Sequence, residues 1–236
     1  MVEVEQKETK LRIAEIFDSV QGEGIWSGVP SSFIRVSGCN LRCVWCDTPY
    51  ASWQPEGPFL TLGQIAARVG RLRHIVLTGG EPMLFEGCVE LCRILRARGH
   101  VITIETAGTI YREIECDLMS ISPKLAHSAP PSSSGWRKRH EQTRTNLESL
   151  RRLIQTYPFQ LKFVVDPASE ADLTEIETLL SEIPQVDPDR ILLMPEGVHP
   201  DELARKMKQL VPVVMDKGWR LCPRLHVELF GNTRGT

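Results

Sequence analysis

The chain contains 236 residues, of which 42% are hydrophobic and 25% charged, and its formal net charge is −2. This composition indicates a soluble globular protein with enough chain for a sizeable core, and the small charge gives no general attraction to nucleic acid or anionic membranes. No apolar run approaches the roughly 20 residues of a membrane-spanning helix. We therefore expect one cytoplasmic domain over residues 1–236, with a charged, flexible lead-in over residues 1–10 and no secretory signal.

Short apolar segments alternate with amphipathic segments from residue 31 onward. Periodicity predicts strands at residues 32–36, 74–78, 101–105, 117–122, 160–165, 190–194 and 219–221. It predicts helices at residues 62–72, 85–98, 169–182 and 200–216, the first with Thr61 as N-cap. Such alternation is typical of right-handed βα units around a parallel sheet. About six units are too few for a closed eight-fold barrel, so we expect an α/β fold that is either a truncated, TIM-like partial barrel or an open sheet.

Polar and glycine-rich segments follow five of the predicted strands. They are Ser37-Gly38-Cys39, Thr78-Gly79-Gly80-Glu81, Glu105-Thr106-Ala107-Gly108, Ser122-Pro123-Lys124 and Met194-Pro195-Glu196-Gly197. Ligands bind at the carboxyl ends of parallel strands in both barrels and open sheets. The sequence therefore predicts a single site formed by these five segments.

The segment 126–146 does not follow the βα pattern. It is rich in Pro, Ser and basic residues, which predicts a mobile loop. Its cluster Trp136-Arg137-Lys138-Arg139-His140 can contact a phosphate or RNA, but a solvated loop is the simpler interpretation, so we do not expect a nucleic-acid partner.

The seven cysteines form two groups. An odd number of cysteines without a signal peptide argues against a disulfide framework. Cys88, Cys92, Cys116 and Cys222 are interpreted as small core residues. The remaining three have the spacing C-x3-C-x2-C and need a separate explanation.

Three interpretations apply to Cys39, Cys43 and Cys46. Structural zinc needs four tetrahedral ligands, but there is no second cysteine pair, and His74 and His100 are poorly spaced to help. Three unrelated buried thiols would not explain so tight a group in a polar loop. A [4Fe–4S] cluster uses thiolate ligands, and with only three of them one iron keeps an open position for a small molecule. We favour the cluster and keep zinc as the alternative.

The cysteine spacing, with Trp45 before the last cysteine, resembles the signature of the radical S-adenosylmethionine superfamily. The turn Thr78-Gly79-Gly80-Glu81-Pro82 resembles the superfamily element that binds the methionine amino group. Glycines allow the backbone to approach a ligand closely. The resemblance implies that the open iron binds S-adenosylmethionine and that one electron from the cluster releases a 5′-deoxyadenosyl radical.

Further segments narrow the resemblance to one family. They are Val20-Gln21-Gly22-Glu23-Gly24, Phe33-Ile34-Arg35, Cys46-Asp47-Thr48, Glu105-Thr106-Ala107-Gly108-Thr109 and Ser122-Pro123-Lys124. From about residue 12 onward the chain closely resembles the 7-carboxy-7-deazaguanine synthase family. This implies a homodimeric lyase with a partial barrel and a magnesium ion. It also implies ring contraction of 6-carboxy-5,6,7,8-tetrahydropterin with release of ammonia, in the queuosine (7-deazapurine) pathway.

The resemblance also implies the site residues. Substrate contacts are expected from Val20, Gln21, Gly22, Glu23, Arg35, Thr78 and His226. Cofactor contacts are expected from Trp45, Cys46, Asp47, Gly80, Glu81, Glu105, Ser122, Pro123, Lys124, Met194 and Pro195. The cluster ligands would be Cys39, Cys43 and Cys46, and Thr48 would bind Mg²⁺. A guanidinium such as that of Arg35 suits a carboxylate, and Mg²⁺ accepts few protein ligands.

Two positions and two rival functions remain open. Met194 stands where relatives commonly have Gln, and methionine cannot donate an amide hydrogen bond; His226 can instead be an ordinary core histidine. The reaction implies an electron donor of the flavodoxin or ferredoxin type. A glycyl-radical-enzyme activase shares the cysteine spacing but usually carries further cysteine motifs. A non-enzymatic iron–sulfur or zinc module would contact RNA through residues 136–140.

Overall fold

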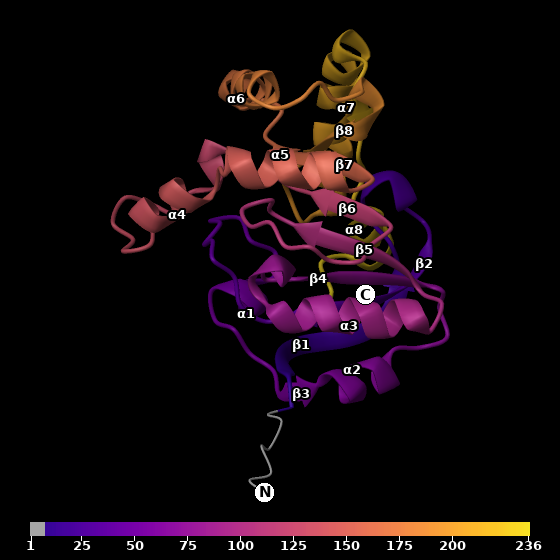
Figure 1. Cartoon of the computed structure of the whole chain (residues 1–236). Helices are drawn as coiled ribbons and strands as arrows, with labels where there is room; N and C mark the ends of the chain where they lie inside the picture. Colours follow the sequence, from indigo (N-terminus) through magenta and orange to yellow (C-terminus); the bar gives the residue numbers. More distant parts are fainter. Residues whose placement is uncertain (1–7) are drawn as a thin grey trace, which may run out of the picture.

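The structure is a computed structural model that describes residues 8–236. Its centre is a nine-stranded sheet with the order β3-β1-β2-β4-β5-β6-β7-β8-β9 (Figure 1). The strands are β1 Lys10–Val20, β2 Pro30–Val36, β3 Phe59–Thr61, β4 His74–Gly79, β5 Val101–Thr106, β6 Leu118–Ile121, β7 Phe159–Val165, β8 Ile191–Pro195 and β9 Arg220–Leu221. Neighbouring strands from β2 to β9 pair in parallel. The sheet is not closed, because β3 and β9 are its edges, and the predicted α/β fold with an incomplete barrel is confirmed.

The strand β1 is the main element that the sequence analysis did not predict. It pairs antiparallel with β2, placing Ile16 opposite Ile34, and also with β3. Its buried residues Leu11 and Ile13 join the core, so the strand is held by apolar burial as well as by the ladder. Of the predicted flexible lead-in 1–10, residues 1–7 lie outside the described residues, and Lys10 already belongs to β1.

Helices cover the near face of the sheet in Figure 1, where α2, α3 and α5 lie in front of the strands and α8 lies behind them. The α-helices are α1 Pro49–Ser52, α2 Leu62–Arg68, α3 Glu86–Ala97, α4 Arg137–Thr143, α5 Leu147–Thr156, α6 Glu170–Ser181, α7 Pro200–Lys217 and α8 Leu225–Phe230. Short 3-10 turns are η1 Gly24–Trp26, η2 Pro82–Leu84, η3 Ala126–Ser128 and η4 Pro188–Arg190. The predicted N-cap Thr61 is confirmed, since its side chain accepts from the Gln64 amide in a capping box.

The helix α2 ends at Arg68, four residues before the predicted end at residue 72. Val69 already has extended backbone angles, and at the next residue, Gly70, a side chain would collide with the carboxylate of Asp18. This contact between distant parts of the chain could not be read from local periodicity.

The segment 126–146 contains η3 and α4, whereas the sequence analysis predicts a loop. The side chain of His140 in α4 is fully buried. Its Nδ1 accepts from the Arg42 amide at 3.1 Å, and its Nε2 lies 3.0 Å from the Ser128 hydroxyl. Burial of one polar side chain with two partners thus orders a segment of loop-like composition. Mobility of this segment stays a prediction.

The core lies between the sheet and its covering helices. The strands β7 and β8 are buried along their whole length, as expected for parallel strands covered on both faces. Cys88 and Cys92 of α3 are fully buried, in agreement with their interpretation as core residues. None of the helices formed by residues 8–236 has the length and apolar character needed to cross a membrane.

Candidate active site

One cavity of about 820 Å³ gathers the segments that follow the parallel strands. Of the residues that the sequence analysis predicts for the site, the following line this cavity: Val20, Gln21, Gly22, Glu23, Arg35, Cys39, Cys43, Trp45, Cys46, Asp47, Thr48, Thr78, Gly80, Glu105, Ser122, Lys124, Met194 and His226. Three predicted residues, Glu81, Pro123 and Pro195, do not line it. The predicted convergence of the strand ends is therefore confirmed.

Cys39, Cys43 and Cys46 line one part of this cavity, which we call the thiol end, as free thiols. Burial raises the pKa of Cys39 to about 12 and that of Cys43 to about 11, so both thiols keep their protons until a bound metal supplies positive charge. No fourth cysteine among the described residues lines the cavity. These donors fit a cluster with one iron left open to the cavity.

The number of available ligands bears on which metal the cysteines could hold. Within residues 8–236, no three His, Cys, Asp or Glu side chains come close enough together to hold one ion. Tetrahedral zinc needs four ligands around one centre, with sulfur about 2.3 Å away. The thiolates of an iron–sulfur cluster bind different irons and lie further apart. Among the described residues that line the cavity only three cysteines are present, which is one ligand short for structural zinc but enough for a cluster with an open iron.

The cysteine loop, residues 37–48, is held through its backbone. Arg42 Nη1 donates to the carbonyl oxygens of Cys39 and Leu41 at 2.8 and 2.7 Å. Trp53 Nε1 donates to the Cys43 carbonyl at 2.9 Å, and the Val44 amide donates to Ser128 O at 2.9 Å. Two sulfur atoms are also in contact, since Cys46 Sγ lies 3.1 Å from Ser52 Oγ and Cys39 Sγ accepts from the Leu41 amide at 3.4 Å.

The glycine turn after β4 packs directly on the cysteine loop. The Gly80 amide donates to Val36 O and the Glu81 amide to Gly38 O, both at 2.9 Å. A Cβ atom at Gly80 would collide with the carbonyl oxygen of Gly38. Only glycine allows this approach, which places the turn and the thiols at the same end of the cavity.

Glu81 lies beneath this turn and is fully buried. Its carboxylate accepts from Met83 N at 3.0 Å, Thr106 Oγ1 at 2.8 Å and Ala107 N at 2.8 Å. Burial raises its pKa. Its side chain therefore joins the glycine turn to the end of β5, and its contact with the cofactor's ammonium group stays a prediction.

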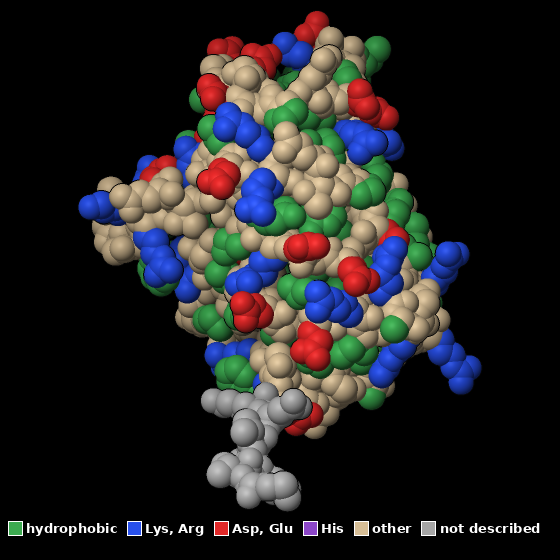
Figure 2. Space-filling view, in the orientation of Figure 1, with side chains coloured by type: hydrophobic (Ala, Val, Ile, Leu, Met, Phe, Trp, Pro, Cys, Tyr) green, Lys and Arg blue, Asp and Glu red, His purple; other side chains and the backbone are tan. Residues whose placement is uncertain are grey.

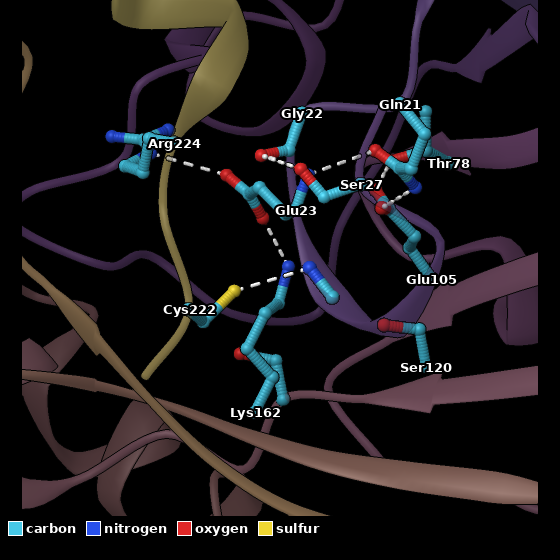
Figure 3. A network of polar contacts seen from close by, with 12 residues as sticks. Gln21, Gly22, Glu23, Ser27, Thr78, Glu105, Ser120, Lys162, Cys222 and Arg224 are labelled. Atoms are coloured by element: carbon cyan, nitrogen blue, oxygen red, sulfur yellow. Dashed lines mark hydrogen bonds and ion pairs between the residues drawn. The ribbon is translucent and has the colours of Figure 1, made fainter. Parts of the chain in front are cut away.

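A buried charge network lines a second part of the cavity, which we call the charged end, and it reaches the cysteine loop at Asp47 (Figure 3). Lys162 of β7 and Arg224 each form an ion pair with the carboxylate of Glu23, and Arg224 also pairs with Asp47. The side chains of Lys162 and Arg224 are only 7% and 8% exposed. Burial opposes ionisation of Glu23, but the two cations outweigh it and hold the pKa of Glu23 well below its usual range.

Gln21, Thr78 and Glu105 form a second set of polar contacts beside this network (Figure 3). Gln21 Nε2 and Thr78 Oγ1 donate to the two carboxylate oxygens of Glu105 at 3.1 and 2.7 Å. The Glu23 amide donates to Gln21 Oε1 at 3.3 Å. Three strand ends thus present acceptors and a hydroxyl to the same part of the cavity.

Arg35 of β2 lines the cavity and lies beside Glu15 and Tyr50, which the sequence analysis did not predict as site residues. Its Nε donates to Glu15 Oε1 at 2.6 Å, and the same oxygen accepts from the Tyr50 hydroxyl at 2.6 Å. No hydrogen bond from its terminal Nη atoms to the described residues is found. The orientation of the guanidinium is fixed by Glu15, while its outer edge remains available for an anion.

The remaining predicted residues form two walls. Lys124 Nζ donates to the carbonyl and hydroxyl oxygens of Ser122, both at 2.8 Å, and lies 5.7 Å from the ring centroid of Trp45. Trp45 packs against an apolar cluster that includes Met194. The buried Nε1 of Trp45 has no hydrogen-bond partner among the described residues. This orphaned donor lies in a side chain that lines the cavity, where a ligand can satisfy it.

His226 of α8 packs on Gly22 and lines the cavity. The Leu225 amide donates to Gly22 O at 2.9 Å, and a side chain at position 22 would collide with the His226 ring. Burial lowers the pKa of His226. Its position beside Glu23 favours a site residue over an ordinary core histidine.

Comparison with known proteins agrees with this site. A profile of the Radical SAM superfamily matches residues 33–126. The 7-carboxy-7-deazaguanine synthase of Rhodopirellula baltica is 44% identical over 97% of this chain and 90% of its own length. That of Halobacterium salinarum is 42% identical over 96% of this chain and 93% of its own. The chain belongs to the 7-carboxy-7-deazaguanine synthase family.

Solved structures support the fold of this family member. The crystal structure of QueE from Escherichia coli superposes with a TM-score of 0.69 at 24% identity, covering 92% of this chain and 95% of that one. A structure of TYW1 with a lysine-pyruvate adduct bound has a TM-score of 0.56 at 16% identity, covering 79% of this chain and 72% of that one. At these identities the likeness shows the architecture alone.

Several residues of this family member were missed by sequence reasoning. Lys162 interrupts the apolar run 159–165, and a charged residue in a buried strand is a usable signal of a paired or functional group. Arg224 and Glu15 gave no comparable signal, because their partners are distant in sequence. The last residues, 232–236, also line the cavity.

Proposed function

We propose that this chain is a radical S-adenosylmethionine lyase. It would convert 6-carboxy-5,6,7,8-tetrahydropterin to 7-carboxy-7-deazaguanine with release of ammonia, in the queuosine (7-deazapurine) pathway. The observation that carries the proposal is the cavity, because it has three free thiols at one end and a preorganised set of carboxylate, amide and guanidinium groups at the other. An activase acting on a protein would have no use for the second end.

The charged end suits a pterin that carries a carboxylate. The free edge of Arg35 would bind the carboxylate. Gln21 and the ionised Glu23 would bind the amino-pyrimidinone edge, with Val20 and Gly22 contributing backbone contacts. His226 would face the same ring as a hydrogen-bonding group.

The thiol end suits the cluster and S-adenosylmethionine. A bound [4Fe–4S] cluster, held by Cys39, Cys43 and Cys46, would supply the electron that cleaves the sulfonium of the cofactor. The glycine turn at Gly80 and the Ser122-Pro123-Lys124 segment would hold its methionine and ribose, and main-chain groups of residues 45–47 its adenine. Glu105, which contacts both Gln21 and Thr78, is assigned to the point where substrate and cofactor meet.

Four further assignments belong to this proposal. Thr48 would bind Mg²⁺ beside the substrate carboxylate, since it lines the cavity and its hydroxyl lies 3.8 Å from Cys46 Sγ. The protein would act as a homodimer and accept electrons from a flavodoxin- or ferredoxin-type carrier. A cytoplasmic location is supported by the seven free thiols, because reduced cysteines are typical of that compartment.

Anaerobic reconstitution tests the proposal. The protein is loaded with iron and sulfide and incubated with Mg²⁺, S-adenosylmethionine, dithionite and 6-carboxytetrahydropterin, and the products are examined by mass spectrometry. We expect the deazapurine and one equivalent of ammonia per turnover. A colourless protein that leaves the pterin unchanged would contradict the proposal.

A further inference from the structure

The segment 126–146 has no role in the proposed reaction, yet it packs on the cysteine loop. The Val44 amide donates to Ser128 O at 2.9 Å, and the Arg42 amide donates to His140 Nδ1 at 3.1 Å. Both Ser128 and His140 are fully buried. The position of α4 is thus fixed relative to the thiols.

The outward side of α4 is basic. Lys138 and Arg139 are exposed, and neither forms an ion pair with an acidic residue in the part of the chain that the structure describes. The acidic residue of this helix, Glu141, is already paired with Arg137 and Arg144. Figure 2 shows Lys and Arg side chains gathered on the lobe that α4 forms at the left of the molecule. Unpaired cations at a surface attract an acidic partner over a distance of about 10 Å.

An aromatic ring connects this basic surface to the cysteine loop. The guanidinium carbons of Arg42 and Arg139 lie 4.0 and 5.2 Å from the ring centroid of Trp136. Arg42 also holds the backbone of the cysteine loop through the carbonyl oxygens of Cys39 and Leu41. The basic surface and the thiols therefore belong to one continuous set of contacts.

The cysteine loop itself exposes an apolar side chain at this place. Val44 lies between Cys43 and Cys46 in the sequence, and it is 58% exposed. It follows directly after Cys43 and stands two residues before Cys46, which are two of the proposed cluster ligands. An apolar contact beside unpaired charges is typical of the small, transient surfaces on which redox proteins meet.

We propose that Val44 and the outward side of α4, with Lys138 and Arg139, form the docking surface for an acidic flavoprotein of the flavodoxin class. This inference rests on the proposed function, since only a cluster enzyme needs a donor. The apolar edge of a flavin matches Val44, whereas the basic residues match acidic side chains around it. One electron leaves the reduced flavin and enters the cluster, and no atom passes between the two proteins.

Charge reversal on α4 tests the surface. The variant Lys138→Glu/Arg139→Glu is compared with Arg205→Glu/Lys208→Glu, which makes the same change of charge at exposed positions of α7. Two quantities are measured on the reconstituted enzyme. The first is the Kd of a flavodoxin by calorimetry at two ionic strengths, and the second is turnover with either reduced flavodoxin or dithionite as electron source.

We expect the α4 variant to bind flavodoxin at least about tenfold more weakly and to lose the salt dependence of binding. Its flavodoxin-driven turnover should fall in proportion, while its dithionite-driven turnover stays at the wild-type level. The α7 variant should match the wild type in every measurement. Val44→Asp should weaken flavodoxin binding in the same way, because it adds a repelling charge.

Three results would overturn the inference. One is unchanged flavodoxin affinity in the α4 variant. Another is a tight, charge-dependent complex with a ferredoxin in place of flavodoxin. The third is charge-dependent binding of RNA by α4 without binding of either carrier. If dithionite fails to drive wild-type turnover while flavodoxin binding still depends on Lys138 and Arg139, the proposed reaction is wrong and the docking surface stands.

Discussion

The two ends of the cavity differ in how their polar side chains are used. At the charged end, both carboxylate oxygens of Glu23 and both of Glu105 already have partners. At the thiol end, the backbone is tied down by Arg42 and Trp53, but the three sulfur atoms remain free of disulfides. One end is preorganised by the protein's own charges, and the other holds its donors in place until a metal cluster completes it.

Loss of one thiol is expected to have the largest effect. Cys43→Ala leaves two ligands where the cluster needs three, so bound iron should fall and turnover should drop by at least about 1000-fold, or about 4 kcal/mol of barrier. Iron analysis and the pterin assay measure both. Cys92→Ala removes a buried thiol of α3 that does not line the cavity, and it should keep its iron. Equal iron content in the two variants would remove the distinction between the ends.

The second largest effect is expected when a cation is removed from the charged end of the cavity. In Lys162→Met, Glu23 keeps only Arg224, so we expect the KM for the pterin to rise by about 30-fold, or about 2 kcal/mol. Cofactor binding should change little. Lys162→Arg should recover most of the affinity, and Lys217→Met, which breaks a pair with Glu177 on α6, should have no effect on KM.

The same variant has a distinctive pH dependence. The pKa of Glu23 in the native protein lies well below that of a free carboxyl, so it stays ionised at every pH above about 4.3. Without Lys162, burial raises this pKa, and the affinity for the pterin should weaken as the pH falls from 8 to 5, relative to the wild type. Calorimetric titration with the pterin at several pH values measures this. Parallel pH profiles would mean that Lys162 does not keep Glu23 ionised.

The hydrogen bond between His140 of α4 and Arg42 of the cysteine loop can be tested by its pH dependence. Burial lowers its pKa to about 4, and Nδ1 accepts from the Arg42 amide only while it is unprotonated. The unfolded chain, with a pKa near 6.5, therefore binds the proton first. The free energy of unfolding should fall by about 2 kcal/mol as the pH drops from 6.5 to 4. His140→Gln cannot titrate and should lack this component in urea unfolding curves. An identical pH dependence in both proteins would contradict the assignment.

The smallest expected change is at Thr48 of the cysteine loop. Thr48→Ala removes the hydroxyl proposed as the magnesium ligand, so the Mg²⁺ concentration for half-maximal turnover should rise by about tenfold. Thr48→Ser keeps the hydroxyl and should behave like the wild type. If the two variants respond alike to Mg²⁺, the ligand lies elsewhere in the cavity.

Much of the site could be predicted because its residues occur in short local patterns. Cys39, Cys43 and Cys46, Gly79-Gly80 and Ser122-Pro123-Lys124 each stand directly after a recognisable strand. Parallel strands bring such ends to one edge of a sheet, and the cavity contains members of all three groups. Glu81 is the exception within these motifs. Its position was predicted, but its side chain is directed into hydrogen bonds with the end of β5.

Other parts of the site could not be predicted because their partners are distant in the chain. Arg224 contacts Glu23 across about two hundred residues, and Arg35 is oriented by Glu15 of an antiparallel strand that periodicity did not indicate. Similarly, α4 was predicted as loop, since no local signal shows that His140 will be buried against Arg42.

The sequence by itself determined the class of fold, the βα order and the chemistry available, because hydrophobic periodicity and metal-ligand spacing are local properties of the chain. The tertiary structure alone decided which charges neutralise one another. It placed Lys162 and Arg224 on Glu23 and left the outer edge of Arg35 facing the cavity. The physical reason is that the pKa and orientation of a buried group depend on neighbours brought together only when the sheet forms.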